Sequence, residues 1–170
     1  VADLERPPAN LKPMYSVNWS HRHNFDGILS FSMDGEIATS YLQIFRNGSI
    51  EAVDAGLLYV EDGEKTIPSV AYEKEILDSL TRFLDIQQLL GVEPPLFVMM
   101  SLIGVKGYTM AVNRKLHRRQ VYEIDQDRLL TPEVIIDSYD SNPAQFMRPA
   151  FDSIWNATGW PRSMNYAEGE

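Results

Sequence analysis

The sequence predicts an α+β fold, in which a mixed, mostly antiparallel sheet of about six strands, built from hairpins, packs against two main helices at 69–90 and 143–158. Three observations support this prediction. Asn47-Gly48 stands between two stretches rich in β-branched and aromatic residues, the strongest short-range signal for a hairpin. Two later stretches repeat apolar residues at helical spacing and carry helix start and stop residues. Short apolar runs bounded by Gly and Pro favour further strands elsewhere.

Length and composition predict a single α+β domain, which we assign to 16–161. The chain has 170 residues, of which 44% are hydrophobic, enough for a sizeable core. Residues 1–15 contain three prolines and little periodicity, so we expect a linker or an extended N-terminal arm there. We expect 162–170 to form a polar C-terminal tail.

The first strands are predicted from alternation and from turn residues. In 27–33, "GILSFSM", apolar and polar residues alternate as in a half-buried strand, and Asp34-Gly35 marks a turn. A two-residue loop at Asn47-Gly48 would then put Phe45 opposite Ile50 and Leu42 opposite Val53.

The helix predicted at 69–90 has signals at both ends. Pro68 or Ser69 starts it, and Gly91 follows its last turn. Glu73 and Glu75 lie near the N-terminus, where the helix dipole favours negative charge. One apolar stripe at helical spacing faces the sheet and consists of Ile76, Leu77, Leu80, Phe83, Leu84 and Leu90.

A continuous apolar run, "LFVMMSLI" at 96–103, predicts a strand at the centre of the sheet with both faces covered. We expect 108–112 to return beside it. Two further short strands are expected in 120–124 and 133–137, and Pro132 indicates that the latter begins at, or lies on, an edge.

The helix predicted at 143–158 is capped by Asn142, has Pro143 in its first turn and ends before Gly159. Pro149 falls inside this stretch, so it either kinks the helix or marks its true first turn. The expected buried side consists of Met147, Phe151, Ile154 and Trp155.

Composition excludes several function classes. The chain has no cysteine, which removes disulfides, thiolate nucleophiles and sulfur-ligated zinc. A chain without cysteine has a cytoplasmic location as its default expectation. No apolar run reaches the length of a membrane span, so we expect no membrane association. Asp and Glu outnumber Lys and Arg by 24 to 15, and this charge disfavours nonspecific binding to nucleic acid.

A local basic stretch stands against that acidic background. Its residues are Arg114, Lys115, His117, Arg118 and Arg119. A loop of this composition can bind phosphates of RNA or DNA, or the acidic surface of a partner. The alternative is a solvated hairpin tip, balanced by the acidic residues that follow at 123–127.

Two further groups are candidates for chemistry. His21, His23 and Asp26 have side chains that could ligate a divalent metal, although a metal site would need more ligands. In the expected hairpin register, Asp54 faces Tyr41 among apolar neighbours, where a carboxylate could act as a base. The alternative for Asp54 is a strand-end residue that accepts a hydrogen bond from a backbone amide.

The common catalytic and nucleotide-binding signatures are absent from the sequence. It contains no G-x-S-x-G, no G-x-x-x-x-G-K, no H-E-x-x-H and no Gly-rich dinucleotide turn. We therefore expect no catalytic residues, no resident metal and no cofactor.

Several stretches together resemble a known family. They are "HNFDGILSFS", "SYLQIFRNGSIEAVDAGLL", "IPSVAYEKEILDSL", "GVEPPLFVMMSLIGVKGYTMAV" and "RPAFDSIWNATGWPRSMNY". They are similar to the C-terminal region of bacterial and archaeal proteins that begin with a Schlafen-like AlbA-type domain and are labelled DNA-binding or ATP-binding. The resemblance covers about residues 24 to 166. It implies an accessory module, since the family's nucleic-acid and nucleotide associations belong to the N-terminal domain, which has no counterpart here.

We therefore expect a non-catalytic interaction module of a larger protein, serving oligomerisation or partner contact. Its partners would be a second copy or the protein's own N-terminal domain, with nucleic acid reached through the full-length protein. Direct nucleic-acid binding through 114–119 is the alternative, and a hydrolase-type enzyme is the second alternative.

Overall fold

A computed structural model describes residues 7–8, 10–61, 63–112 and 122–166 of the chain. It confirms the α+β class, with two helices and several strands. The chain divides into two compact units: unit 1 comprises Val1–Leu57 and Glu75–Glu93, and unit 2 comprises Leu58–Lys74 and Pro94–Glu170. That both belong to one domain, as the sequence predicts for 16–161, stays a prediction. None of the helices in the described ranges is long and apolar enough to cross a membrane.

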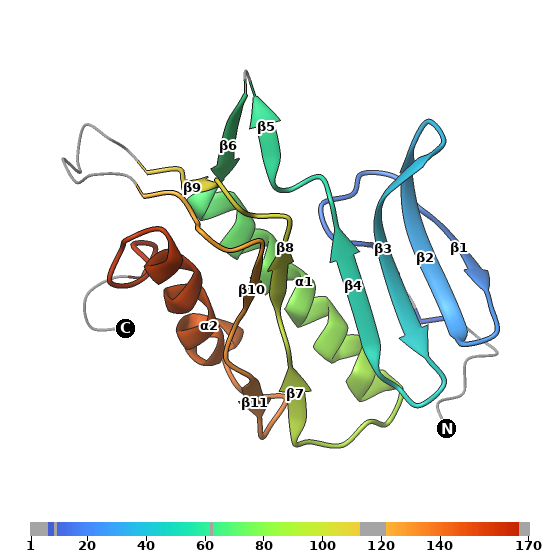
Figure 1. Cartoon of the computed structure of the whole chain (residues 1–170). Helices are drawn as coiled ribbons and strands as arrows, with labels where there is room; N and C mark the ends of the chain where they lie inside the picture. The colour runs from blue at the N-terminus through green and yellow to red at the C-terminus, as the bar shows by residue number, and fades with distance from the viewer. Residues whose placement is uncertain (1–6, 9, 62, 113–121, 167–170) are drawn as a thin grey trace. The chain divides into compact units, whose positions relative to one another are not determined.

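Unit 1 contains a four-stranded antiparallel sheet in the order β1-β2-β3-β4 (Figure 1). Its strands are β1 (Ser20–His23), β2 (Gly27–Asp34), β3 (Ile37–Phe45) and β4 (Ile50–Asp54). The strand predicted at 27–33 is confirmed within β2. The turn predicted at Asp34-Gly35 is confirmed too, with Gly35 at a φ of 59°.

The register predicted for the second hairpin is wrong by one residue. Ile44, not Phe45, lies opposite Ile50, and Leu42 lies opposite Ala52. The backbone N–H groups of Phe45 and Gly48 donate to the carbonyls of Ser49 and Phe45, so the loop has three residues, 46–48. Gly48 has a φ of 87°, as the last position of such a three-residue loop requires.

One face of this sheet forms the core of unit 1. The buried cluster consists of Leu11, Ile28, Leu42, Ile44 and Ile86. Leu11 belongs to the stretch predicted as a linker or arm, so part of that stretch is instead packed into the core. Ile28 of β2 and Leu42 and Ile44 of β3 enter this core. The alternation in 27–33 predicts the strand but not its buried face, because Ser30 and Ser32 are buried while Met33 is 47% exposed.

Helix α1 (Ser69–Leu89) runs through both units and matches the predicted 69–90 within one residue. At its end, Val92 N–H donates to Gln87 O and Gly91 N–H donates to Gln88 O, with Gly91 at a φ of 71°. This is the glycine C-cap that the sequence predicts. Of the predicted apolar stripe, Leu80 and Leu84 are buried, and the other four residues are partly buried.

Unit 2 contains short strands in three separate sheets, so the predicted single sheet of about six strands is wrong. The structure has eleven strands in its described part, seven of them in unit 2. One sheet joins β5 (Tyr59–Glu61), β6 (Glu64–Ile67) and β9 (Thr109–Met110); the others pair β7 (Leu96–Val98) with β11 (Val134–Ile136) and β8 (Ser101–Ile103) with β10 (Arg128–Leu130). The mixed, mostly antiparallel character is confirmed, since β6 and β9 form the one parallel pair among the strands that the structure describes.

Two strand placements in this unit differ from the prediction. The segment at 108–112 supplies β9, which pairs with β6 and does not lie beside 96–103. In the described part of 120–124, Ile124 has no strand assignment, although it exchanges backbone hydrogen bonds with Gly107 and Tyr108. The strand predicted within 133–137 is confirmed as β11.

Helix α2 (Pro143–Ala157) confirms the second predicted helix. Asn142 caps it by accepting the N–H of Ala144 at 3.0 Å, and Pro149 lies inside it. The four residues predicted for its buried side are buried, together with Ala150.

A buried carboxylate ties α1 to α2 within unit 2. Glu73 is 3% exposed, and its Oε1 accepts hydrogen bonds from Trp155 Nε1 at 2.6 Å, Ser163 Oγ at 2.8 Å and Tyr72 Oη at 3.2 Å. We call these four residues the Glu73 cluster. Burial, with Glu73 close by, raises the pKa of Tyr72. Ser163 belongs to the stretch predicted as a polar tail, so 162–166 instead packs on the helices.

Candidate interaction surface

The two ladders β7–β11 and β8–β10 are consecutive parts of one antiparallel ribbon. Val98 pairs with Val134, and Ser101 pairs with Leu130. Two residues, 99–100, separate the ladders on one side, and three residues, 131–133, separate them on the other. The extra residue makes 131–133 a β-bulge. This segment contains Pro132, which cannot donate a hydrogen bond to a ladder.

The ribbon has apolar residues on both of its faces. One face is buried, with Leu96, Leu102, Val134 and Ile136 all under 9% exposed. On the other face, five large apolar side chains are between 52% and 80% exposed. We call them the apolar face, and they are Phe97, Met99, Ile103, Leu130 and Ile135. Phe97 and Ile135 are directly opposite each other across the ladder.

This finding corrects the prediction for 96–103. The continuous apolar run does not form a central strand with both faces covered: among the described residues β7 and β8 each pair with one strand, and Phe97, Met99 and Ile103 are exposed. An antiparallel sheet that faces water usually carries polar residues on its outer face. An exposed apolar group of this kind is typical of a surface that contacts another protein.

The apolar face carries opposite charges at its two ends. Arg128 is exposed and lies opposite Ile103 at one end. Asp137 is exposed and follows β11 at the other end, with the same parity as Ile135. Neither is joined by an ion pair to another residue in the described ranges. Glu133, in the bulge, is exposed near the middle.

The basic stretch that the sequence predicts as a contact site is not among the described residues. Arg114, Lys115, His117, Arg118 and Arg119 all lie outside the described residues, so nucleic-acid or partner binding by this stretch stays a prediction.

The histidine group lies at the edge of the unit 1 sheet. His21 and His23 are exposed on β1, opposite Ser30 and Ile28, and Asp26 lies in the turn that follows. In the parts of the chain that the structure describes, no three His, Asp or Glu side chains are grouped so that they could hold a metal ion. The geometry therefore gives the metal hypothesis no support.

Asp54 has the structural role that was the alternative to catalysis. It lies opposite Ser40, not Tyr41, at the end of β4. Its Oδ1 accepts the backbone N–H of Leu57 at 2.6 Å and of Gly56 at 3.1 Å. Burial raises the pKa of Asp54, while these two hydrogen bonds oppose that effect. The carboxylate thus closes a turn.

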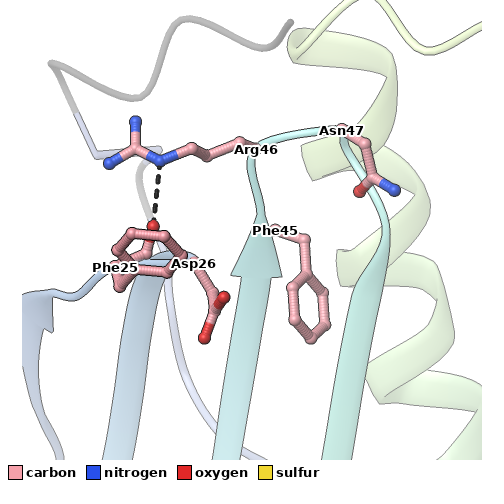
Figure 2. Close-up of a pocket in the computed structure, with 5 residues that line it drawn as sticks. All are labelled: Phe25, Asp26, Phe45, Arg46 and Asn47. Carbon is pink, nitrogen blue, oxygen red and sulfur yellow. Dashed lines mark hydrogen bonds between the residues drawn. The ribbon is translucent and has the colours of Figure 1, made fainter.

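A shallow, open depression of about 440 Å³ lies at the rim of the unit 1 sheet (Figure 2). It is lined by Phe25, Asp26, Phe45, Arg46 and Asn47. Figure 2 shows Arg46 Nε donating to the backbone oxygen of Phe25, at 3.1 Å, while the carboxylate of Asp26 points away from the guanidinium. The polar groups do not converge on one point, so the depression lacks the geometry of a catalytic site.

Comparisons with known proteins add no family to this description: no family model, no curated protein and no solved structure matches the chain.

The apolar face was missed because a continuous apolar run is equally compatible with a strand buried on both sides. One signal was present. The segment that pairs with 96–103 carries Arg128 and Glu133 among its outward residues, and charged residues there are incompatible with a fully covered sheet face.

Proposed function

We propose that the chain is a non-catalytic protein-interaction module and that the apolar face is its contact surface. One observation carries the proposal: five large apolar side chains are exposed together on one ribbon, while the opposite face of the same ribbon is buried. Leaving such side chains in water forgoes roughly 25 cal/mol per Å² of apolar surface, and a protein partner would recover that free energy.

The family resemblance supplies the setting of this proposal. In it, the module is an accessory part of a larger, cytoplasmic protein whose N-terminal part is a Schlafen-like AlbA-type domain. The described residues offer surface for contact and no convergent set of acid, base and nucleophile, which favours an interaction role over catalysis.

Methionine oxidation tests whether the apolar face is covered, whatever covers it. Met99 is 79% exposed on the face, whereas Met33 is 47% exposed in unit 1 and serves as an internal reference. With dilute peroxide and mass spectrometry, we expect Met99 to oxidise faster than Met33 in the dilute chain. We expect selective protection of Met99 when the chain is concentrated or is part of the longer protein.

Two outcomes would contradict the proposal. Met99 could oxidise faster than Met33 under every condition, which would mean that no partner covers the face. Met99 could also be protected in the dilute, monomeric chain, which would mean that the chain covers the face itself. Met110 and Met147, at 3% and 1% exposed, control for unfolding because they should remain unoxidised.

A further inference from the structure

We infer that the partner on the apolar face is a second copy of this chain, packed face to face. The two-fold axis lies in the plane of the interface and is perpendicular to the strands. This inference rests on the proposed function, because it names the occupant of the same surface. It adds an orientation: the Arg128 end of one copy lies over the Asp137 end of the other.

The area of the face suits a dimer of modest size. A large exposed side chain offers on the order of 150 Å² of surface. Five of them supply several hundred of the about 800 Å² that each partner buries in a stable interface. The exposed Ser101 and the residues at the rim supply more. Two such faces can stack as sheets do, about 10 Å apart.

Symmetry makes a second copy a suitable occupant. A two-fold interface uses the same patch on both partners, so it needs a surface that complements itself. An apolar face meets this condition through its side chains. The two charged ends meet it only in one orientation, because a two-fold axis perpendicular to the strands exchanges the ends of the ribbon.

Charge selects between the two possible two-fold arrangements. With the axis perpendicular to the strands, Arg128 of each copy approaches Asp137 of the other, which makes two attractive pairs. With the axis along the strands, Arg128 would approach Arg128 of the other copy, and Asp137 would approach Asp137 of the other copy. Like charges that face each other across an interface are unfavourable, so the first arrangement is preferred.

Glu133 opposes the dimer in either arrangement. It is exposed near the middle of the ribbon, so its two copies approach each other near the axis. The chain also has a net charge of −9, which adds a general repulsion between copies. We therefore expect a weak dimer that Glu133→Gln strengthens, with the dissociation constant falling about threefold.

The absence of native cysteine allows a direct test of this arrangement. Single-cysteine variants Phe97→Cys and Ile103→Cys are made in chains of different mass and mixed. They are treated with a thiol cross-linker whose reach is about 10 Å, the spacing of stacked sheets. Because the proposed axis places position 97 of one copy over position 103 of the other, we expect mixed dimers to exceed both kinds of identical dimer.

The central position and an outside control complete the design. Position 99 lies near the axis, so Met99→Cys should cross-link to position 99 of the other copy. Leu89→Cys on α1 is 72% exposed and lies outside the face, so it gives the background of random collision. Circular dichroism confirms that each variant is folded.

The outcomes separate this inference from the proposed function. Identical dimers in excess of mixed dimers would overturn the orientation. Cross-linking no higher than that of Leu89→Cys would overturn the second copy as partner. If Met99 is nevertheless protected in the longer protein, the proposed function stands with a different occupant.

Charge exchange gives an independent measurement. Arg128→Glu should weaken the dimer about tenfold, because it turns two attractive pairs into two repulsive ones. Adding Asp137→Arg to the same chain should restore most of that loss. Light scattering over a concentration series measures both effects, and a double variant as weak as the single one would contradict the proposed pairing.

Discussion

Unit 1 and unit 2 are built by different means, although one helix runs through both. Unit 1 has a four-stranded antiparallel sheet, and its core joins apolar side chains of β2 and β3 to Leu11 and to Ile86 of α1. Unit 2 has short ladders, and its helices are joined by a buried carboxylate with three hydrogen-bond donors. Unit 2 also exposes apolar side chains on the outer face of its ribbon.

This difference shows two ways in which a sequence specifies structure. In unit 1, many equivalent apolar contacts contribute to stability, so a substitution that keeps volume and polarity should be tolerated. In unit 2, a few polar contacts are made once each, and losing one of them leaves buried groups without partners. Substitutions in the two units test this contrast.

The largest effect is expected at the Glu73 cluster. Glu73→Ala leaves the donors of Tyr72, Trp155 and Ser163 without an acceptor, so we expect a loss of about 3 to 5 kcal/mol in the free energy of unfolding. The control is Glu75→Ala, because Glu75 is on the same helix but in unit 1 and its side chain is 18% exposed. Its Oε1 accepts the N–H of Tyr15 and the hydroxyl of Ser79, both at 2.9 Å, and lies 3.6 Å from Arg82. Because water can reach these groups, we expect the control to lose less, about 1 to 2 kcal/mol. Urea unfolding followed by tryptophan fluorescence measures both, and equal losses would refute the special role of Glu73.

In the core of unit 1, size should matter more than chemical detail. Leu42 is fully buried, and Leu42→Ala should cost about 2 to 5 kcal/mol because it opens a cavity. Leu42→Met preserves volume and should cost less than about 1.5 kcal/mol. Denaturant unfolding compares the two. If Leu42→Met were as harmful as Leu42→Ala, unit 1 would depend on specific contacts, as unit 2 does.

The glycines of the β2–β3 and β3–β4 hairpins allow a finer test. Both have positive φ, but a Cβ on Gly48 would lie 2.5 Å from Val92 Cγ2, whereas one on Gly35 would have open space. We expect Gly48→Ala to cost about 2 kcal/mol and Gly35→Ala about 1 kcal/mol. Thermal unfolding measures the difference. Equal costs would mean that only the backbone conformation matters at these turns.

The smallest effect is a dependence on alkaline pH in unit 1. Tyr41 Oη donates to Glu51 Oε1 at 2.6 Å, and this hydrogen bond, with burial and the charge of Glu51, raises the pKa of Tyr41 to about 12. Because the folded pKa lies above the ordinary value of 10.0, this stabilisation is fully present below pH 10 and is lost as the pH rises through about 12. In an ultraviolet titration of the phenols, Glu51→Gln should move one tyrosine to lower pH. An unchanged titration would show that Glu51 does not control Tyr41.

Local signals in the sequence were sufficient where one segment determines its own structure. The ends of both helices followed from Ser69, Gly91, Asn142 and Pro143, because caps and turn residues act on their own backbone. The hairpin at Asn47-Gly48 was also found. Its register was not, because loops of two and three residues both accept glycine in the last position.

Long-range polar pairing could not be read in the same way. Glu73 falls on the apolar stripe of its helix, three and seven residues before Ile76 and Leu80, and was interpreted as a favourable charge near the helix start. Trp155 is an indole donor on the buried side of the other helix. Their pairing across 82 positions leaves no periodic trace, since one contact of this kind can be supplied by any nearby polar residue.

The sequence by itself determined the fold class, the two helices with their ends, and β2, β3 and β4 of unit 1, because these depend on interactions between residues close in the chain. Only the tertiary structure decided the strand partners in unit 2, the burial of Glu73 and the exposure of the apolar face. The physical reason is that an apolar side chain gains the same free energy against any apolar neighbour. Which face of a ribbon finds such a neighbour therefore depends on how distant segments pack, and not on the residues of the ribbon alone.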